Sequence, residues 1–243
     1  MKILAINGSP RGELSNTQTI LKSFLKGATS KGAETEIILL SDKIIHPCKG
    51  CWACWVKTPG VCIQKDDMGD ILKKIWECDL LIFASPLYVD CVSGQLKVFM
   101  DRMIPGLMPN FVKIDGVWRH PLRQETPPKI GVVCNSGFPQ HEHFQVIRHL
   151  FERVALNMHT EVVVEIYRAG GEILRAKSLL LKPLIIKYKK LLEKAGKEVV
   201  QKGRLSEKLK ALLEEDIVSP DTYIKNANAY WEKQLSKLDR KKN

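Results

Sequence analysis

Four closely spaced cysteines are the group in this sequence best suited to metal or redox chemistry. Cys48, Cys51, Cys54 and Cys62 lie in CKGCWACWVKTPGVC, separated by two, two and seven residues. Two successive Cys-x-x-Cys units match the compact run that ligates an iron–sulfur cluster. Zinc sites more often pair two separate Cys-x-x-Cys units or use His. A dithiol site without metal is the third interpretation, and the residues alone leave all three open.

The number and setting of the cysteines indicate the cellular compartment of the protein, and the three cysteines outside the quartet do not indicate a further site. Seven is an odd number and does not indicate a secreted disulfide framework. Cys78, Cys91 and Cys134 lie in apolar surroundings and are interpreted as inert core residues. No apolar run approaches the ~20 residues that cross a bilayer, and the N-terminus resembles a strand rather than a leader. We therefore expect a cytoplasmic protein with no membrane partner.

A second candidate site follows the first apolar run of the chain. Residues 2–17 read KILAINGSPRGELSNT: a buried strand, turn residues, and capping residues before a helix. This order directs free backbone N–H groups and the positive end of a helix dipole at an anion in the loop. The dinucleotide and Walker glycine patterns are both absent. The side chains that could add donors to the anion are Ser9, Arg11, Ser15, Asn16 and Thr17.

The elements that must position these residues alternate along the first two thirds of the chain. Residues 42–65 look irregular, and residues 105–128 are predicted to be a long loop. The alternation predicts an α/β fold with a doubly wound, five-stranded parallel sheet. The strands are expected at 3–6, 35–40, 80–84, 129–134 and 160–166, and the helices after 17 and at 68–76, 93–103 and 140–156.

Ligands of doubly wound sheets bind at the carboxyl ends of the strands. Three loops of this chain follow such ends, at residues 7–17, 85–92 and 135–141. All three are rich in Gly, Pro, Ser or Asn. The sequence therefore predicts that they converge on one cleft.

In their order and spacing, these loops resemble those of the NAD(P)H-dependent FMN reductase and iron–sulfur flavoprotein family, which is flavodoxin-like. The resemblance rests on GSPRGELSNT, SPLYVDCVSGQLKVFMDR and NSGFPQ, and it covers residues 1 to about 167. It implies that FMN binds, with its phosphate on the first loop. The expected contacts are Ser9, Arg11, Ser15, Asn16 and Thr17 for the phosphate, Pro86, Leu87, Tyr88 and Val89 for the ring and ribityl chain, and Asn135, Ser136, Gly137 and Phe138 on the other side.

The same resemblance implies an activity and a second cofactor. Iron–sulfur flavoproteins bind a 4Fe–4S cluster through a compact cysteine quartet, which corresponds here to Cys48, Cys51, Cys54 and Cys62. Other chains of the wider group carry similar cysteines without an evident cluster. The expected function is an FMN-dependent oxidoreductase that passes electrons from NAD(P)H or a redox partner to an acceptor. The alternative is a non-catalytic flavin and iron–sulfur electron-transfer protein. No catalytic side chain is expected, since the flavin supplies the chemistry.

The last third of the chain is predicted to be wholly helical. We expect a flavodoxin-like FMN-binding domain at 1–167, with a Cys-rich loop at 46–65, and a helical extension at 168–243. Helix-spaced apolar residues occur at 179–195, 205–213 and 221–238, with breaks at Pro183, Gly196, Gly203 and Pro220.

The extension is also basic, with 19 Lys and Arg against 10 Asp and Glu, about +9 of the net +11. These charges interleave with acids and apolar residues, so we interpret them as solvated helix faces and expect no nucleic acid partner. The apolar faces must be covered, which predicts a homodimer or homotetramer. The resemblance adds a ferredoxin-like redox partner.

Overall fold

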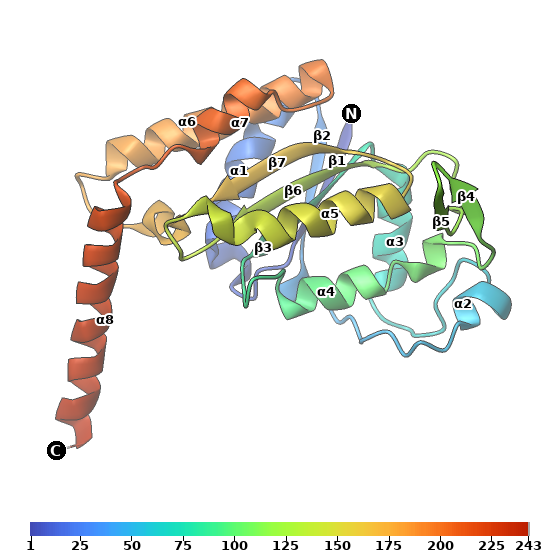
Figure 1. The fold of residues 1–243 in the computed structure, drawn as a ribbon, viewed down its shortest axis with the longest axis horizontal. Helices are drawn as coiled ribbons and strands as arrows, with labels where there is room; N and C mark the ends of the chain where they lie inside the picture. Colours follow the sequence, from blue (N-terminus) through green and yellow to red (C-terminus); the bar gives the residue numbers. More distant parts are fainter. Residues whose placement is uncertain (243) are drawn as a thin grey trace.

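Five parallel strands form the centre of the fold in a computed structural model, which describes residues 1–242 and the side chains of residues 1–238 (Figure 1). The strand order is β2-β1-β3-β6-β7, the flavodoxin-like arrangement. All seven residues of β3 are buried, because helices cover both faces of the sheet. The predicted doubly wound sheet is confirmed. Its strands are β1 (Lys2–Asn7), β2 (Glu34–Leu39), β3 (Leu80–Pro86), β6 (Lys129–Asn135) and β7 (Val162–Arg168).

Two helical layers enclose the sheet, each with its own apolar core. One layer contains α1 (Asn16–Thr29), α6 (Lys182–Lys202) and α7 (Glu207–Glu214). The other contains α3 (Met68–Glu77), α4 (Gly94–Asp101) and α5 (Gln145–Asn157). Helices α6 and α7 of the C-terminal extension therefore form part of one of the two helical layers that cover the sheet.

The extension packs on α1 through two glycines. A Cβ atom on Gly196 would lie 1.9 Å from the carbonyl oxygen of Phe24, and one on Gly27 would lie 1.9 Å from that of Glu193. The two helix backbones touch at these points. The predicted helix break at Gly196 is therefore wrong: α6 continues to Lys202, and this glycine permits the close approach.

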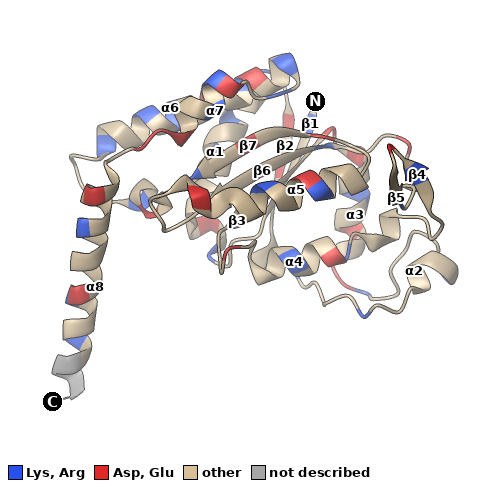
Figure 2. Cartoon of the chain, viewed as in Figure 1, with Lys and Arg blue, Asp and Glu red and all other residues tan. Residues whose placement is uncertain are grey.

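The last helix, α8 (Pro220–Lys242), points away from the rest of the molecule (Figure 1). None of its described side chains is buried, and Trp231 and Leu235 are 62% and 60% exposed. Figure 2 shows basic and acidic residues interspersed along the helices of the extension.

The segment predicted to be a long loop contains a β-hairpin, so that prediction is wrong in part. Strands β4 (Val112–Ile114) and β5 (Val117–Arg119) pair antiparallel. Asp115 and Gly116 form the turn with φ of 49° and 80°, the positive values that a two-residue hairpin requires. Strands of three residues are too short to show an alternating pattern, so the sequence did not reveal them.

Several helix boundaries also differ from the expected ones. Helix α5 begins at Gln145 instead of 140, because Pro139 and a short 3-10 turn at His141–Phe144 precede it. Helix α6 begins at Lys182 instead of 179. One helical turn, α2 (Ala53–Val56), lies inside the segment expected to be irregular. Within the described residues, no helix is long and apolar enough to cross a bilayer.

Candidate functional site

The loop after β1 is held in place by its own buried polar side chains. Asn7 Oδ1 accepts the N–H of Ser9 (2.9 Å), and Asn7 Nδ2 donates to Gln18 Oε1 (2.9 Å). Ser15 caps α1 by accepting the N–H of Gln18 (3.0 Å) and donates its own proton to the Gly12 carbonyl (2.7 Å). The loop is therefore already organised, with the positive end of the α1 dipole facing it.

The first turn of α1 still has hydrogen-bonding groups to offer a ligand. The N–H groups of Asn16 and Thr17 precede the first residue that can find an acceptor inside the helix. The hydroxyls of Ser9 and Thr17 each accept a hydrogen bond, from Arg11 N (3.4 Å) and Asn135 Nδ2 (2.7 Å), so their own protons remain available. These donors suit a phosphate.

Three of the predicted phosphate contacts have other partners or none. The proton of Ser15 goes to a carbonyl, so its hydroxyl serves to shape the loop. Arg11 lies 3.3 Å from Glu172, and both side chains are more than half exposed. Asn16 Oδ1 is buried and has no hydrogen-bond partner among the described residues. An unpaired buried oxygen is costly, which suggests that a ligand hydroxyl completes this position.

Hydrogen bonds join the three loops, so their predicted convergence is confirmed. Asn135 in the third loop donates to Thr17 in the first, and the Leu87 N–H in the second loop donates to the Asn135 carbonyl (2.8 Å). The Gly8 N–H donates to the Ala84 carbonyl (2.7 Å) at the end of β3. A Cβ atom on Gly8 would lie 2.6 Å from the Cβ of Leu96 in α4, so only glycine fits between the first loop and this helix.

The second loop presents apolar side chains on a sharp turn. Tyr88 and Cys91 exchange both backbone hydrogen bonds (2.9 and 3.1 Å), which leaves Val89 and Asp90 at the tip. Their φ values are 48° and 55°, a conformation that costs a β-branched residue about 1–3 kcal/mol. Val89 is 98% exposed, and Tyr88 and Phe138 are about half exposed. This strained turn gives a flat apolar ligand a surface to lie against.

The other predicted contacts support these exposed side chains. Pro86, Leu87, Asn135 and Ser136 are buried. The carbonyl of Gly137 accepts a hydrogen bond from the hydroxyl of Tyr223 in α8 (2.9 Å). The predicted contacts therefore surround one region of the carboxyl edge.

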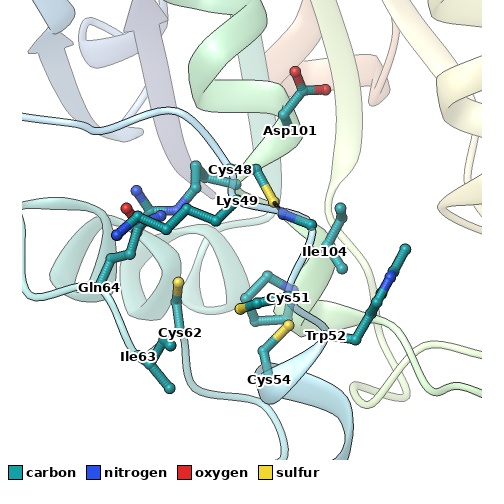
Figure 3. A pocket seen from close by; sticks show the side chains of 13 residues that line it. Cys48, Lys49, Cys51, Trp52, Cys54, Cys62, Ile63, Gln64, Asp101 and Ile104 are labelled. Atoms are coloured by element: carbon teal, nitrogen blue, oxygen red, sulfur yellow. Dashed lines mark hydrogen bonds between the residues drawn. The ribbon is translucent and has the colours of Figure 1, made fainter.

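The four cysteines of the quartet line one hollow, around which their side chains are arranged (Figure 3). Gly50 and Trp52 adopt φ of 62° and 56°, which curls the backbone between the first three cysteines. Burial raises the pKa of the Cys54 thiol, and the nearby sulfur of Cys62 raises it further. Four crowded thiols of this kind favour a positively charged centre that would hold them as thiolates.

The sulfurs do not converge on a point. Within the described part of the chain, no three Cys, His, Asp or Glu side chains are arranged to hold a single metal ion. A zinc ion needs four ligands within about 2.3 Å of one centre. A four-iron cluster binds four cysteines over a larger volume and so suits this donor set better.

A buried ion pair closes the base of the cysteine loop. Arg102, just after α4, donates from Nη1 to Asp66 Oδ2 (2.6 Å) and from Nη2 to Asp66 Oδ1 (3.0 Å). The two side chains are 1% and 0% exposed. Asp66 also accepts the N–H groups of His46 (3.0 Å) and Met68 (3.2 Å). One carboxylate therefore ties together both ends of the loop and α4.

Aromatic side chains brace the other side of the cysteine loop. The ring of Trp55 lies 4.3 Å from that of Trp52 and 4.9 Å from that of His120, which follows β5. Trp55 Nε1 also donates to the carbonyl of Ile104 (3.3 Å). The hairpin segment thus supports the cysteine loop.

Sequence reasoning missed Arg102, His120 and Trp55 as parts of the site. One signal was available for Arg102: it lies three and six residues after Phe99 and Leu96, on the apolar stripe of its helix. A charged residue on a buried stripe predicts a buried partner. The positions of His120 and Trp55 depend on the hairpin, which the sequence pattern did not reveal.

The first 169 residues match the family model of NADPH-dependent FMN reductase. Among curated proteins, an iron–sulfur flavoprotein of Methanocaldococcus jannaschii is 46% identical over 105 residues, covering 43% of this chain and 53% of that protein. One from Archaeoglobus fulgidus is 41% identical over 105 residues, covering 43% of this chain and 46% of the relative. The matched region spans about half the length of these relatives.

Solved structures agree on the fold. An FMN-dependent NADH-azoreductase from Bacillus anthracis, solved with FMN, has a TM-score of 0.59 at 16% identity and covers 82% of this chain and 99% of its own. An NAD(P)H:quinone oxidoreductase from Methanothermobacter marburgensis has a TM-score of 0.58 at 16% identity. The match covers 82% of this chain and 96% of that structure.

The Asp66–Arg102 pair predicts how stability changes in acid. Burial acts to raise the pKa of Asp66, but the bonds from Arg102 and two backbone amides outweigh it and lower the pKa. Because its pKa is lower in the folded state, ionised Asp66 stabilises the fold at pH values above the ordinary carboxyl pKa. This contribution is lost as pH falls through the folded pKa. Asp66→Asn leaves a buried Arg unpaired and should cost about 3–5 kcal/mol at neutral pH.

Urea unfolding at neutral and acidic pH measures this effect, with Asp70→Asn as the control. Asp70 lies in α3 and pairs with Lys73 on the surface, so its loss should change stability little. Equal free energies of unfolding for the two variants at neutral pH would refute the stabilising role of the Asp66–Arg102 pair.

Proposed function

The chain belongs to the NADPH-dependent FMN reductase family, and we propose that it is an FMN-dependent oxidoreductase that passes electrons from NAD(P)H or a redox partner to an acceptor. The observation that carries the proposal is the preformed anion loop at β1, joined by hydrogen bonds to two further loops at the same edge of the sheet. Family membership and the fold of the FMN-dependent structures support it.

The three loops divide two tasks in binding FMN. The hydroxyls of Ser9 and Thr17, with the first-turn amides of α1, hold the phosphate. The 88–91 turn and Phe138 give the ring its apolar contacts and keep water away from it. The chemistry that bound FMN would supply here is the acceptance of hydride from NAD(P)H and the transfer of electrons to an acceptor. This scheme requires no side chain to act as acid or base.

We propose that Cys48, Cys51, Cys54 and Cys62 hold a 4Fe–4S cluster. Their shared hollow, their mutual effect on the pKa of Cys54 and the matches to proteins named iron–sulfur flavoproteins support this. The second candidate function, an electron-transfer protein without a small substrate, rests on the same hollow. Oxidation of NAD(P)H by the purified protein distinguishes the two.

A single preparation tests both cofactors. Protein purified without oxygen should show flavin absorption bands, about four irons and four sulfides per chain, and NAD(P)H oxidation. Thr17→Val removes the hydroxyl that we propose binds the phosphate and should weaken FMN binding about 10- to 100-fold, since a hydrogen bond to a charged group contributes roughly 1.5–3 kcal/mol. Titration of the apoprotein with FMN, followed by fluorescence quenching, measures this change.

The controls keep the neighbouring groups intact. Thr17→Ser retains the hydroxyl and should bind FMN like the wild type. Cys91→Ser lies outside the quartet and should retain iron, whereas Cys54→Ser should lose it. A colourless protein that does not bind added FMN would disprove the oxidoreductase function, and a yellow protein without iron would disprove only the cluster.

An acidic, ferredoxin-like protein is the redox partner that the cysteine loop favours. Residues 43–65 contain four lysines, all exposed, and no Asp or Glu. Charge complementarity would steer an acidic donor to this loop. Reduction by such a donor should slow as ionic strength rises and should slow in Lys49→Glu at low salt. A rate that does not depend on salt would exclude this docking surface.

We also propose that α8 pairs with a second copy of the chain, as a homodimer or homotetramer requires. Ile224, Trp231, Leu235 and Leu238 recur at intervals of seven, four and three residues on one face of this helix, and all are exposed. A symmetric partner would cover the same face on both copies.

Light scattering at micromolar concentration measures the predicted assembly. Leu235→Glu should shift the protein towards the monomer, because a charge enters the apolar stripe. Lys233→Glu introduces the same residue on the opposite face of α8 and should leave the assembly unchanged. A monomeric wild type would contradict the pairing.

A further inference from the structure

Three of the five N–H groups of the Arg102 guanidinium donate hydrogen bonds, and the N–H on Nε is not among them. Nη1 donates to the His46 carbonyl (2.6 Å) and to Asp66, and Nη2 donates to Asp66. Nε is buried and has no hydrogen-bond partner among the residues that the structure describes. Buried polar groups nearly always have a partner, so this N–H needs an explanation.

The unused donor belongs to a side chain that lines the cysteine hollow. Arg102 borders this hollow together with the four cysteines. Cys62 borders the same hollow and lies four residues before Asp66, the partner of Arg102.

Cys62 is also the ligand whose position most needs fixing. It lies seven residues beyond Cys54, whereas the other cysteines are two residues apart. Pro59 and Gly60 lie in the gap, and Gly60 has a φ of 84°. A hydrogen bond from a residue outside the loop would hold Cys62 in position beside the other three cysteines.

We propose that Arg102 is a positioning residue for the cluster and donates a charge-assisted hydrogen bond from its spare N–H to the Cys62 sulfur. This inference rests on the proposed 4Fe–4S cluster. Asp66 offsets the charge of Arg102 and fixes its plane, so the effect on Cys62 comes from a directed N–H group. Hydrogen bonds to ligand sulfurs stabilise the reduced, more negative cluster and raise its reduction potential.

The test compares Arg102→Lys with the wild type after reconstitution with iron and sulfide. Lysine keeps a charge beside Asp66 but lacks the planar group that reaches His46, Asp66 and Cys62 together. The midpoint potential, from a redox titration followed by electron paramagnetic resonance, should fall by at least 59 mV, a tenfold change for a one-electron couple. The variant should also lose iron faster to a chelator.

Arg123→Lys is the matched control. Arg123 also lies beside the cysteine loop, with its Cδ 3.4 Å from the Cβ position of Gly60, but its Nε donates to the Pro105 carbonyl (3.2 Å). Its replacement should leave the potential and the rate of iron loss unchanged.

An unchanged potential in Arg102→Lys, or an equal fall of the potential in Arg123→Lys, would overturn the inference.

Two further outcomes are separable. If Arg102→Lys does not fold, the charge-neutral pair Arg102→Gln with Asp66→Asn replaces it, compared with Asp66→Asn alone and with the same criteria. A wild type without iron would remove the cluster proposal and this inference with it. A wild type with a full cluster, together with an Arg102→Lys variant whose midpoint potential is unchanged, would disprove this inference and leave the cluster proposal standing.

Discussion

The parallel register of β1, β3 and β6 is the constraint on which the rest of the structure depends. Asn7 pairs with Ala84, and Pro86 pairs with Asn135, so the three strands end at one edge as direct neighbours. Their loops are then close enough for Gly8 to donate to the Ala84 carbonyl, Leu87 to the Asn135 carbonyl, and Asn135 to Thr17. No residue of these loops could reach its partner if one strand were reversed or displaced in the order.

Features with a strong local signal could be predicted from the sequence, and features set by tertiary contacts could not. The buried apolar runs identified all five strands, and the polar residues after them identified the loops of the site. The helix through Gly196 was missed because only the contact with Phe24 explains that glycine. The left-handed conformation of Val89 contradicts its own propensity. The surrounding bonds of Tyr88 and Cys91 impose it.

The C-terminal extension is tied to the same edge of the sheet and does not form a separate core. Arg168, at the end of β7, is 1% exposed and donates to the carbonyls of Leu213 (3.2 Å) and Glu215 (2.8 Å), at the end of α7. Helix α6 packs against α1, whose first turn faces the anion loop. Tyr223 bonds the third loop. Changes in the extension would therefore reach the site through three contacts.

Helix α4 connects the two candidate cofactor sites physically. Ser93 caps its first turn and donates to the carbonyl of Gly8 in the first loop, while Arg102 follows its last residue and borders the cysteine hollow. The helix has eight residues, which sets about 12 Å between its ends. Leu96 and Phe99 are fully buried, so the helix cannot shift without disturbing the core. The second loop therefore continues into a rigid helix that fixes the cysteine hollow relative to the three loops at the carboxyl edge of the sheet.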